Sequence, residues 1–521
     1  MSFYPSRALL VVLCSVALYA RAQVPTFTSI TTAGGTRPNS GNALAVDAAG
    51  NSYVAGSFGF DQLGGTIDLG NIHMVSMGGS DGFVAKFNPQ GTCLWARQIS
   101  GLQRDEAFGV VVLSDGSILI AGEFEGTNSI GSSTLISHGG SDIFLAAFNS
   151  AGDLQWAKAI GGTMDDFAIG LTAGVNGSAF FTGSFTGNID LGGGIAFSSA
   201  DEDAILIKLN TVGDAQWART GTGTGSQFGS DVKVDAQGNI FWAGEFDSAI
   251  SFGTTNLTST GVNVFLAKYD DAGNRLWVRK LGSGDQAQLP RIALGADGRF
   301  LCSAVYSGQY TLAGQNLPAG IDDVLLASFD AAGNLQWVST FGGPELNACT
   351  GLLLDASGDC YLSGYFRGAM NVGSVTLTSV GGTDVFVVRC RPDGQFEGAI
   401  RGGGIGPDVA LSAAWGPSGD IRVTGSFSGT AQFGNISVTA SDAGMKTFLA
   451  TIAPPPRLQI TAFPDYVLVR WPGYATGFNL ESKTELSLPS WSPVNSAQLV
   501  NGEFVVSNHM SGPIQFFRLR K

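Results

Sequence analysis

Seven equivalent positions carry most of the side chains that could do chemistry in this chain. Each lies four residues before an expected strand that opens a repeat of about 60 residues. Six are carboxylates or amides, namely Asn39, Asp105, Asp166, Gln227, Asn347 and Asp408; the seventh is Ala287, flanked by Asp285 and Gln286. A ring of these oxygens could hold a hard cation such as Ca²⁺ or bind sugar hydroxyls. Alternatively, each side chain caps its own loop by accepting hydrogen bonds from backbone amides.

Two other series recur with the same period. Acids open the third expected strand of most repeats, at Asp81, Asp142, Asp203, Asp323 and Asp384. They end a long loop, and we expect them to stabilise it. Tryptophans mark the fourth strand, at Trp95, Trp156, Trp217, Trp277 and Trp337, and Phe396 takes the next place. We expect these rings to form a structural core between adjacent repeats; the alternative is a stacking platform for sugars.

Familiar enzyme motifs are absent from the sequence. It has no Gly-x-Ser-x-Gly elbow, no phosphate-binding glycine loop before a helix and no EF-hand loop. The histidines, His73, His138 and His509, share no spacing, and no Cys-x-x-Cys pair is present. We therefore expect neither a catalytic residue set, nor a metal site, nor a cofactor, Ca²⁺ in the ring aside. The sequence leaves open the alternative of a carboxylate pair for glycoside cleavage, because the distance between two acids cannot be read from a sequence.

The elements that must position these side chains are the repeats themselves. Four strand-like segments align in each one, and the second ends in Gly-x-aromatic, as in Gly56-Ser57-Phe58. The first three segments occur seven times, but the Trp segment occurs only six times after the first repeat begins. Thr26–Gly35 has the same extended run closing in Gly-Gly. Closure removes exposed sheet edges. The sequence therefore predicts an all-β, seven-bladed propeller of four-stranded blades, closed by the N-terminal strand, over residues 23–453.

The connections predict two different faces. Short turns such as Asp47-Ala-Ala-Gly50-Asn51 join the first strand to the second and the third to the fourth. Roughly 15 to 20 residues, as in Thr186–Glu202, join the second strand to the third and suggest an added hairpin. In a meander, the long connections all leave from one face. Binding sites tend to lie on such loops over a rigid scaffold.

Composition and charge narrow the class of protein. The chain has 75 glycines, 44% hydrophobic residues and a formal net charge of −14. That apolar content argues against disorder. Residues 23–453 hold 20 basic and 38 acidic side chains, an excess of acids that disfavours nucleic-acid binding.

The N-terminus predicts export. Arg7, the apolar run Ala8–Ala20 and the small residues at Ala20 and Ala22 are typical of a signal peptide over residues 1–22, cleaved after Ala22. No later stretch is apolar enough to span a membrane. Five cysteines remain after cleavage, an odd number that is not a disulfide framework. A single Cys360–Cys390 bridge is possible, and buried free thiols are the alternative.

Three stretches resemble a known repeat family. Ala45–Phe58 (AVDAAGNSYVAGSF), Gly78–Gly91 (GGSDGFVAKFNPQG) and Leu154–Gly162 (LQWAKAIGG) resemble the seven-bladed beta-propeller (SBBP-type) repeat of bacterial secreted proteins. The resemblance covers roughly Val24–Ala453. It implies an extracytoplasmic propeller, and it implies no shared reaction or set of site residues.

The last part of the chain differs from the repeats. Pro454-Pro455-Pro456 reads as a stiff linker over residues 454–456. Residues 457–521 then read as five or six short strands and resemble a small fibronectin-III or immunoglobulin-like β-sandwich, on the pieces Phe478–Leu486 and Phe516–Lys521.

These observations favour a secreted or cell-surface, monomeric protein without catalytic activity. Its long-loop face is expected to bind an extracellular protein or glycan. The alternative is a carbohydrate-active lyase or hydrolase that uses acids on the same face.

Overall fold

The computed structural model describes residues 24–60, 63–456 and, with short gaps, 458–520. Within these residues the chain is all-β, as predicted, and has no α-helix; a short 3-10 turn, η1 (Val175–Gly177), is its one helical element. No helix of the described part is long and apolar enough to cross a membrane. The expected signal peptide, Met1–Ala22, lies outside the described residues.

The strands from β1 to β39 form seven consecutive four-stranded antiparallel units, numbered here in chain order. The first strands are β2 (Asn39–Val46), β8 (Asp105–Val112), β12 (Asp166–Ala173), β18 (Gln227–Val234), β24 (Ser283–Leu294), β29 (Asn347–Leu354) and β35 (Val409–Trp415). The second strands are β3 (Ser52–Phe58), β9 (Ile118–Ile130), β13 (Ala179–Phe185), β19 (Ile240–Phe246), β25 (Phe300–Leu312), β30 (Cys360–Phe366) and β36 (Ile421–Phe427).

The outer strands of the units follow the same order. The third strands are β6 (Asp81–Phe87), β10 (Ser133–Phe148), β16 (Asp203–Leu209), β22 (Asn263–Tyr269), β27 (Gly320–Phe329), β33 (Asp384–Cys390) and β39 (Lys446–Ala453). The fourth strands are β7 (Cys93–Gly101), β11 (Leu154–Ile160), β17 (Ala215–Thr224), β23 (Arg275–Lys280), β28 (Leu335–Phe341), β34 (Phe396–Gly404) and β1 (Thr26–Thr32). The fourth strand of unit 7 is thus the first strand of the chain.

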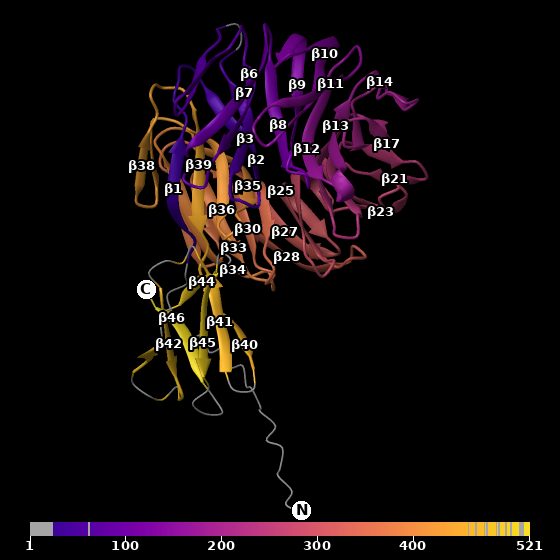
Figure 1. The fold of residues 1–521 in the computed structure, drawn as a ribbon. Helices are drawn as coiled ribbons and strands as arrows, with labels where there is room; N and C mark the ends of the chain where they lie inside the picture. The colour runs from indigo at the N-terminus through magenta and orange to yellow at the C-terminus, as the bar shows by residue number, and fades with distance from the viewer. Residues whose placement is uncertain are drawn as a thin grey trace, which may run out of the picture.

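The units are arranged in a cycle. Each first strand contacts the first strand of the next unit, and β35 of unit 7 contacts β2 of unit 1. β1 pairs antiparallel with β39, from Thr26 opposite Ala453 to Thr32 opposite Phe448, and the two strands lie side by side in Figure 1. Seven buried apolar clusters each join residues of two adjacent units. We call the boundary between two units a seam; burial at the seams is what holds the units together.

The short turns form as their residues predict. In the first of them, Asp47 accepts hydrogen bonds from the backbone N–H groups of Ala49 and Asn51, at 3.0 and 2.8 Å. Gly50 follows at φ 83°, a left-handed conformation that favours glycine. Turns of this kind restrict one face of the ring to short connections, and the opposite face, which we call the long-loop face, carries all the long ones.

A hairpin is inserted between the second and third strands, as the sequence suggests. The separate hairpins are β4 (Thr66–Leu69) with β5 (Ile72–Val75), β14 (Asn188–Asp190) with β15 (Ala196–Ser198), β20 (Ala249–Phe252) with β21 (Thr255–Thr258), β31 (Ala369–Val372) with β32 (Val375–Thr378), and β37 (Thr430–Phe433) with β38 (Ile436–Thr439). In unit 2 the ends of β9 and β10 form it, and in unit 5 the end of β25 pairs with β26 (Gln315–Asn316).

Each hairpin reaches back to the preceding unit. β20 pairs with β17, and β37 with β34; in unit 2 the extended end of β9 pairs with β7. These contacts explain the Gly-Gly pairs that close the Trp segments. A Cβ added at Gly162 would lie 1.8 Å from the Asn188 carbonyl oxygen, and one at Gly343 would lie 1.8 Å from that of Ala369. The hairpin backbone occupies the space that a side chain would need.

We expect Gly162→Ala and Gly343→Ala to destabilise the ring by roughly 1–3 kcal/mol each, the usual cost of overpacking. Gly70→Ala is the matched control, because Gly70 sits at a hairpin tip at φ 65° with open space around it; it carries only the conformational cost of about 1 kcal/mol. Urea unfolding of the three variants measures the difference. Equal losses would refute the close-approach explanation.

Two smaller sheets follow the ring. β40 (Gln459–Ala462), β41 (Tyr466–Pro472), β45 (Glu503–His509) and β44 (Gln498–Val500) form one; β43 (Ser492–Pro493), β42 (Asn479–Lys483) and β46 (Phe516–Arg520) form the other. Val469 and Trp471 from the first sheet and Leu480 from the second belong to one buried cluster. In Figure 1 these sheets lie below the ring, on the side opposite the long-loop face. Pro454 and Pro455, expected in a linker, are buried.

Candidate functional site

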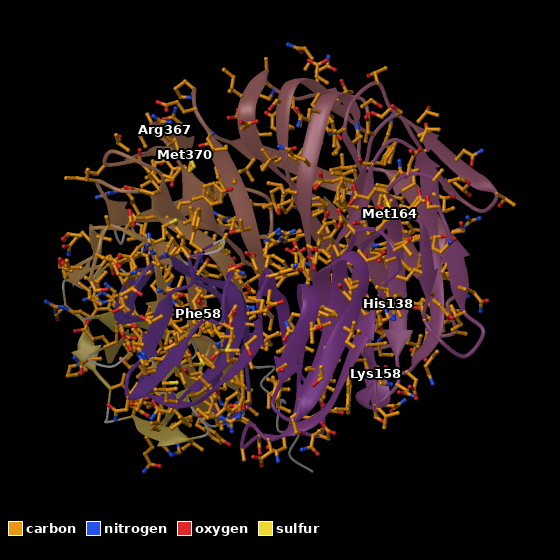
Figure 2. All side chains as sticks on the ribbon, turned by 90° about the horizontal axis from the view of Figure 1, so that it is seen from above. Phe58, His138, Lys158, Met164, Arg367 and Met370 are labelled. Atoms are coloured by element: carbon orange, nitrogen blue, oxygen red, sulfur yellow. The ribbon has the colours of Figure 1, made fainter. Side chains whose placement is uncertain are left out.

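The long-loop face gathers the exposed apolar side chains of the ring. Nine large hydrophobic residues on its loops are more than a third exposed: Phe60, Leu63, Met77, Leu102, Met164, Ile321, Leu346, Val380 and Ile405. On the short-turn face, Val212 is the one such residue among the described turns. Figure 2 views the ring from the long-loop side and labels Met164 and His138 there. The loops of this face therefore carry more exposed apolar side chains than the turns of the opposite face, and others, such as Leu94 and Leu276, are exposed on strands.

Two seams present these side chains as equivalent pairs. At the seam of units 1 and 2, Gly78, which follows Met77, lies against the backbone of Leu102; a Cβ on Gly78 would be 2.5 Å from the Leu102 carbonyl oxygen. At the seam of units 6 and 7, Gly381, which follows Val380, lies in the same way against Ile405, which is 83% exposed. Loops from two units thus form each pair, and the glycines let their backbones approach closely.

A depression of about 830 Å³ lies at the seam of units 2 and 3. His138, the segment 161–163 and the hairpin β14–β15 line it, and the His138 side chain is 68% exposed. Met164 follows directly and packs against Gly187. The depression therefore adds polar groups at its rim to the exposed apolar side chains of the long-loop face.

The long-loop face is also acidic. Its described loops carry six acids, Asp165, Asp201, Glu202, Asp247, Glu345 and Asp442, and three more, Glu125, Asp285 and Asp322, lie in strands that reach it. Three arginines accompany them, and two of these are paired with carboxylates, Arg104 with Glu106 and Glu123, and Arg367 with Glu345. The face therefore combines apolar pairs with a net negative charge.

The six oxygen-bearing residues predicted as a ring lie beneath this surface. Each is at most 2% exposed, and each lies at the start of a first strand or directly before it. Their backbones hold the seams: the N–H of Asp105 donates to the Ser80 carbonyl at 2.8 Å, and that of Asp408 to Thr383 at 2.7 Å. Because neighbouring loops cover them, they present no oxygen ring to a ligand in solution.

The side chains of five of the six residues bond to nearby loops, whereas the two buried carboxyl oxygens of Asp105 have no hydrogen-bond partner within the part of the chain that the structure describes. Asp166 accepts from the backbone N–H of Gly162 and Asp408 from that of Gly404, both at 2.7 Å. Asn39 accepts from Thr447 N–H at 2.7 Å, across the closing seam. Gln227 donates to the Thr224 carbonyl and Asn347 to that of Glu345. These are the bonds of the capping interpretation. In the described residues, no group of three or more His, Cys, Asp or Glu side chains is placed to hold a metal ion.

The ring residues and the third-strand acids meet at the seams. The neighbouring acid contributes to a raised pKa in each pair: Asp81 for Asp105, Asp142 for Asp166, and Asp384 for Asp408. A Cβ on Gly403 would lie 2.5 Å from Asp384 Oδ1 and 2.9 Å from Asp408 Oδ2. The sequence does not reveal this pairing, because its members lie in different units.

These buried carboxyl groups have raised pKa values. Burial, reinforced by the neighbouring acid, raises the pKa of Asp105 to about 8. Burial likewise raises the pKa of Asp81, Asp166 and Asp408 to about 7. Groups of this kind can hold a proton near neutral pH, but they are not open to a substrate.

The tryptophans lie between units. Trp95 donates its indole N–H to Ser150 O at 3.2 Å, Trp217 to Asp271 O at 3.1 Å and Trp337 to Pro392 O at 3.0 Å, each in the third-to-fourth-strand turn of the next unit. Trp95 is 8% exposed, and Trp156, Trp217, Trp277 and Trp337 are partly buried. Such rings fill the seams and leave little face for sugar stacking.

Arginines two residues after the Trp complete these contacts. Arg97 and Arg219 lie over the rings of Trp95 and Trp217, and both donate at 2.7 Å to a turn carbonyl of the next unit. Cation–π contact and a charge-assisted hydrogen bond thus act together. The recurring Trp-x-Arg pattern is the sequence signal for this contact between adjacent units.

The five cysteines of the described chain are free. Cys360 and Cys390 are directly opposite on β30 and β33 and are both buried, but no disulfide joins them. Of the two alternatives that the sequence leaves open, the structure has the free thiols. Burial raises the pKa of Cys360, which disfavours a reactive thiolate.

No protein-family model matches the chain. The regulatory protein FlaEY of Caulobacter vibrioides is 23% identical over 214 residues, which cover 37% of this chain and 22% of that protein. A WD repeat-containing protein of Acanthamoeba polyphaga mimivirus is 22% identical over 233 residues, covering 36% of this chain and 16% of that protein. The chain spans about a fifth of the length of these curated relatives.

Solved structures of similar fold include the WD40 domain of Neurospora crassa Pan2, with a TM-score of 0.42 and 9% identity over 84% of this chain and all of that one. A puromycin hydrolase matches with a TM-score of 0.35 and 11% identity, over 84% of this chain and 59% of that one. These similarities are too low to carry over a site or an activity.

Proposed function

We propose that this chain is a secreted, non-catalytic binding module, built as a seven-bladed β-propeller followed by a small β-sandwich, and that its long-loop face takes a protein partner. The concentration of exposed apolar side chains on that face carries the proposal. Monomeric proteins rarely keep contiguous apolar surface without a use for it, and such patches typically mark interaction sites.

The chemistry of the face favours a protein over a glycan. The exposed side chains of the two pairs, Met77 with Leu102 and Val380 with Ile405, are aliphatic or thioether groups. These groups pack against apolar side chains of a partner. Glycan sites rely instead on aromatic rings that stack on sugars. The tryptophans of the repeat series lie in the seams, and Phe60 is the one aromatic residue among the nine exposed side chains of this face.

The enzyme alternative has less support. The acids that could have formed a catalytic pair, such as Asp105 and Asp408, are fully buried, and Asp408 is bonded within its loop. A glycoside-cleaving pair must flank a bound sugar, which these residues do not.

Charge substitution on the face tests the proposal. We expect Met77→Asp with Leu102→Asp, or Val380→Asp with Ile405→Asp, to weaken partner binding at least about tenfold, because a buried carboxylate without a partner is costly. Leu94→Asp and Leu276→Asp are matched controls, since both residues are about half exposed at the start of fourth strands, away from the long-loop face.

The measurement is binding of the purified protein to an array of extracellular proteins and glycans, with a product assay on each bound sugar. Equal binding by face variants and wild type would refute the assignment of the face. Turnover of any sugar would refute the non-catalytic role.

A further inference from the structure

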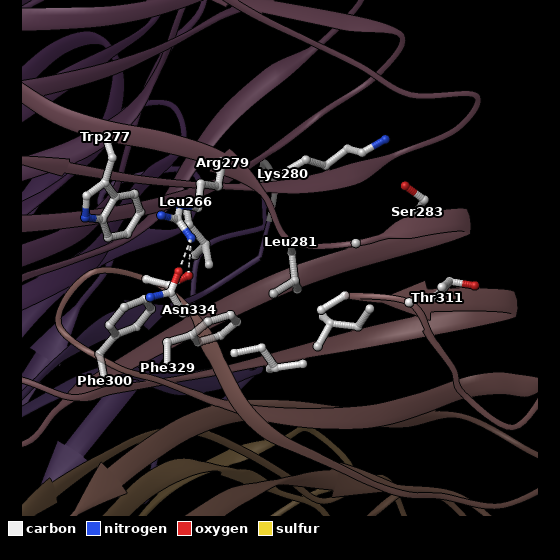
Figure 3. A pocket seen from close by; sticks show the side chains of 16 residues that line it. Leu266, Trp277, Arg279, Lys280, Leu281, Ser283, Phe300, Thr311, Phe329 and Asn334 are labelled. Atoms are coloured by element: carbon white, nitrogen blue, oxygen red, sulfur yellow. Dashed lines mark hydrogen bonds between the residues drawn. The ribbon is translucent and has the colours of Figure 1, made fainter.

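A cavity of about 550 Å³ lies at the outer end of the seam between units 4 and 5, and we call it the seam pocket. Figure 3 shows it between Trp277 and Arg279 of β23, the end of β25 near Thr311, and the turn that holds Asn334. Its walls are largely apolar, with Leu266, Leu281 and Phe329 among them. Size and lining are those of a small-molecule site.

The hairpin of unit 5 differs from the others in its turn. In units 1, 2, 4, 6 and 7 the residue that follows the first hairpin strand is a glycine at positive φ, namely Gly70, Gly131, Gly253, Gly373 and Gly434. In unit 5 this place is taken by Ala313, and both Ala313 and Gly314 line the seam pocket. Ala313 holds φ 46°, a conformation that costs a non-glycine residue about 1 kcal/mol or more. A strained residue thus lines the cavity.

An aromatic wall distinguishes this seam from the others. Phe300 stacks on Phe329, with centroids 4.9 Å apart at 13°, and Trp277 stacks on Phe300 at 5.9 Å and 21°. The other six units have no aromatic residue in the place of Phe300: they carry Ser52, Ile118, Ala179, Ile240, Cys360 and Ile421. Trp277 also lacks the turn acceptor that Trp95, Trp217 and Trp337 use, and its indole N–H has no hydrogen-bond partner.

The polar groups of the pocket are cationic. Among its sixteen lining residues, all described, Arg279 and Lys280 are basic and none is acidic. Arg279 donates to the carbonyls of Ala332 and Gly333, and Lys280 to that of Thr258 at 2.9 Å. These acceptors are neutral. Asp330 is in the same turn as Asn334, and hydrogen bonds from Asn334 together with the charge of Arg279 lower its pKa. Arg279 and Lys280 are neighbours on β23, so their side chains leave on opposite faces of the strand. In a chain of net charge −14, the Arg279 guanidinium beside an aromatic slot favours an anion.

We propose that the seam pocket binds a small amphiphilic anion, with its aromatic or alkyl part against Trp277 and Phe300 and its carboxylate or sulfonate at Arg279. The apolar part is stabilised by burial and by stacking, and the acid group by charge-assisted hydrogen bonds. The site is on the outer rim of the ring, and its occupation does not depend on the proposed role of the long-loop face.

Titration of the full chain with anilinonaphthalene sulfonate tests this site. We expect saturable binding of one probe per chain, quenching of tryptophan fluorescence, and competition by dodecanoate but not by the dodecyltrimethylammonium cation. Phe300→Ile, the residue found at this place in units 2, 4 and 7, should weaken binding about tenfold or more. Arg279→Gln should do the same.

Ser283→Trp covers the mouth from an exposed position and should block the probe without changing the melting temperature, so that loss of the site is separated from loss of the fold. Arg219→Gln is the matched control, because Arg219 has the place of Arg279 at the preceding seam, and it should bind as wild type. Several weak sites per chain, equal competition by the cation, or unchanged affinity in Phe300→Ile and Ser283→Trp would each overturn the proposal.

Discussion

Removal of residues 24–35 should destabilise the ring more than any point substitution. β1 provides the fourth strand of unit 7, and its pairing with β39 joins the two ends of the ring together with the contact of β2 with β35. Phe27 and Ile30 also pack on the cluster shared by units 6 and 7. Six paired residues and two half-buried apolar side chains together are worth on the order of 5 kcal/mol. The deletion also exposes β39 as an unpaired edge, which favours aggregation.

Thermal unfolding followed by circular dichroism, with light scattering in parallel, measures this effect. A protein lacking residues 457–521 is the control, because that deletion leaves all seven units intact. A synthetic peptide of residues 24–35 added in trans should restore part of the lost melting temperature, since it can pair with the free edge of β39. If the deletion melts at the wild-type temperature, β1 does not close the ring.

The regular parts of this fold could be predicted because the same short sequence patterns recur in every repeat. The Asp-x-x-Gly turns, the Gly-x-aromatic ends and the Trp period all encode strand pairing within a unit, which depends on residues near in sequence. The N-terminal strand could be assigned because its Gly-Gly exit matches the other copies. In the structure, Gly34 lies next to Asp68 of unit 1, just as Gly343 lies against Ala369 of unit 6.

The sites could not be predicted to the same depth, because they depend on contacts between units. Asn39 and Asp408 were candidates for a surface ring, and only the packing of neighbouring loops shows that they are buried. Phe300 differs from its counterparts in sequence, but its stacking with Trp277 and Phe329 forms only where units 4 and 5 pack together. The apolar pair of Val380 and Ile405 forms from two loops whose proximity no sequence period encodes.

The second large effect concerns pH, and we expect the ring to lose stability as the pH rises from about 4 to 8. Burial raises the pKa of Asp81, Asp166 and Asp408 to about 7 and that of Asp105 to about 8, whereas in the unfolded chain these groups titrate near 3.9. Between the two values the folded state holds more protons than the unfolded state. Stability therefore falls with rising pH in this window.

The groups around each seam carboxyl group do not reverse this sign. Asp105 is near Asp81 and Glu125, and Asp166 is near Asp142 and Asp165, all acids. Asp408 has Asp384 and one cation, Arg401, beside it, and its pKa is still raised. At the opposite end of the range, turn carboxylates such as Asp270 and Asp330 have lowered pKa values, so they remove stability only as the pH falls below about 4.

Urea unfolding between pH 4 and pH 9 measures this dependence. The residues at the equivalent position in other units suggest the matched variants. Asn39, Gln227 and Asn347 place an amide where Asp105, Asp166 and Asp408 place an acid, so an amide fits this seam position and mimics a carboxyl group that cannot ionise. Asp105→Asn, Asp166→Asn and Asp408→Asn should each flatten part of the slope, and the triple variant should exceed wild type in stability at pH 8 by several kcal/mol. Wild-type stability that is level or rises between pH 5 and pH 8 would show that these carboxyl groups are ionised in the folded ring, because the protons that the seams are expected to hold would then be missing.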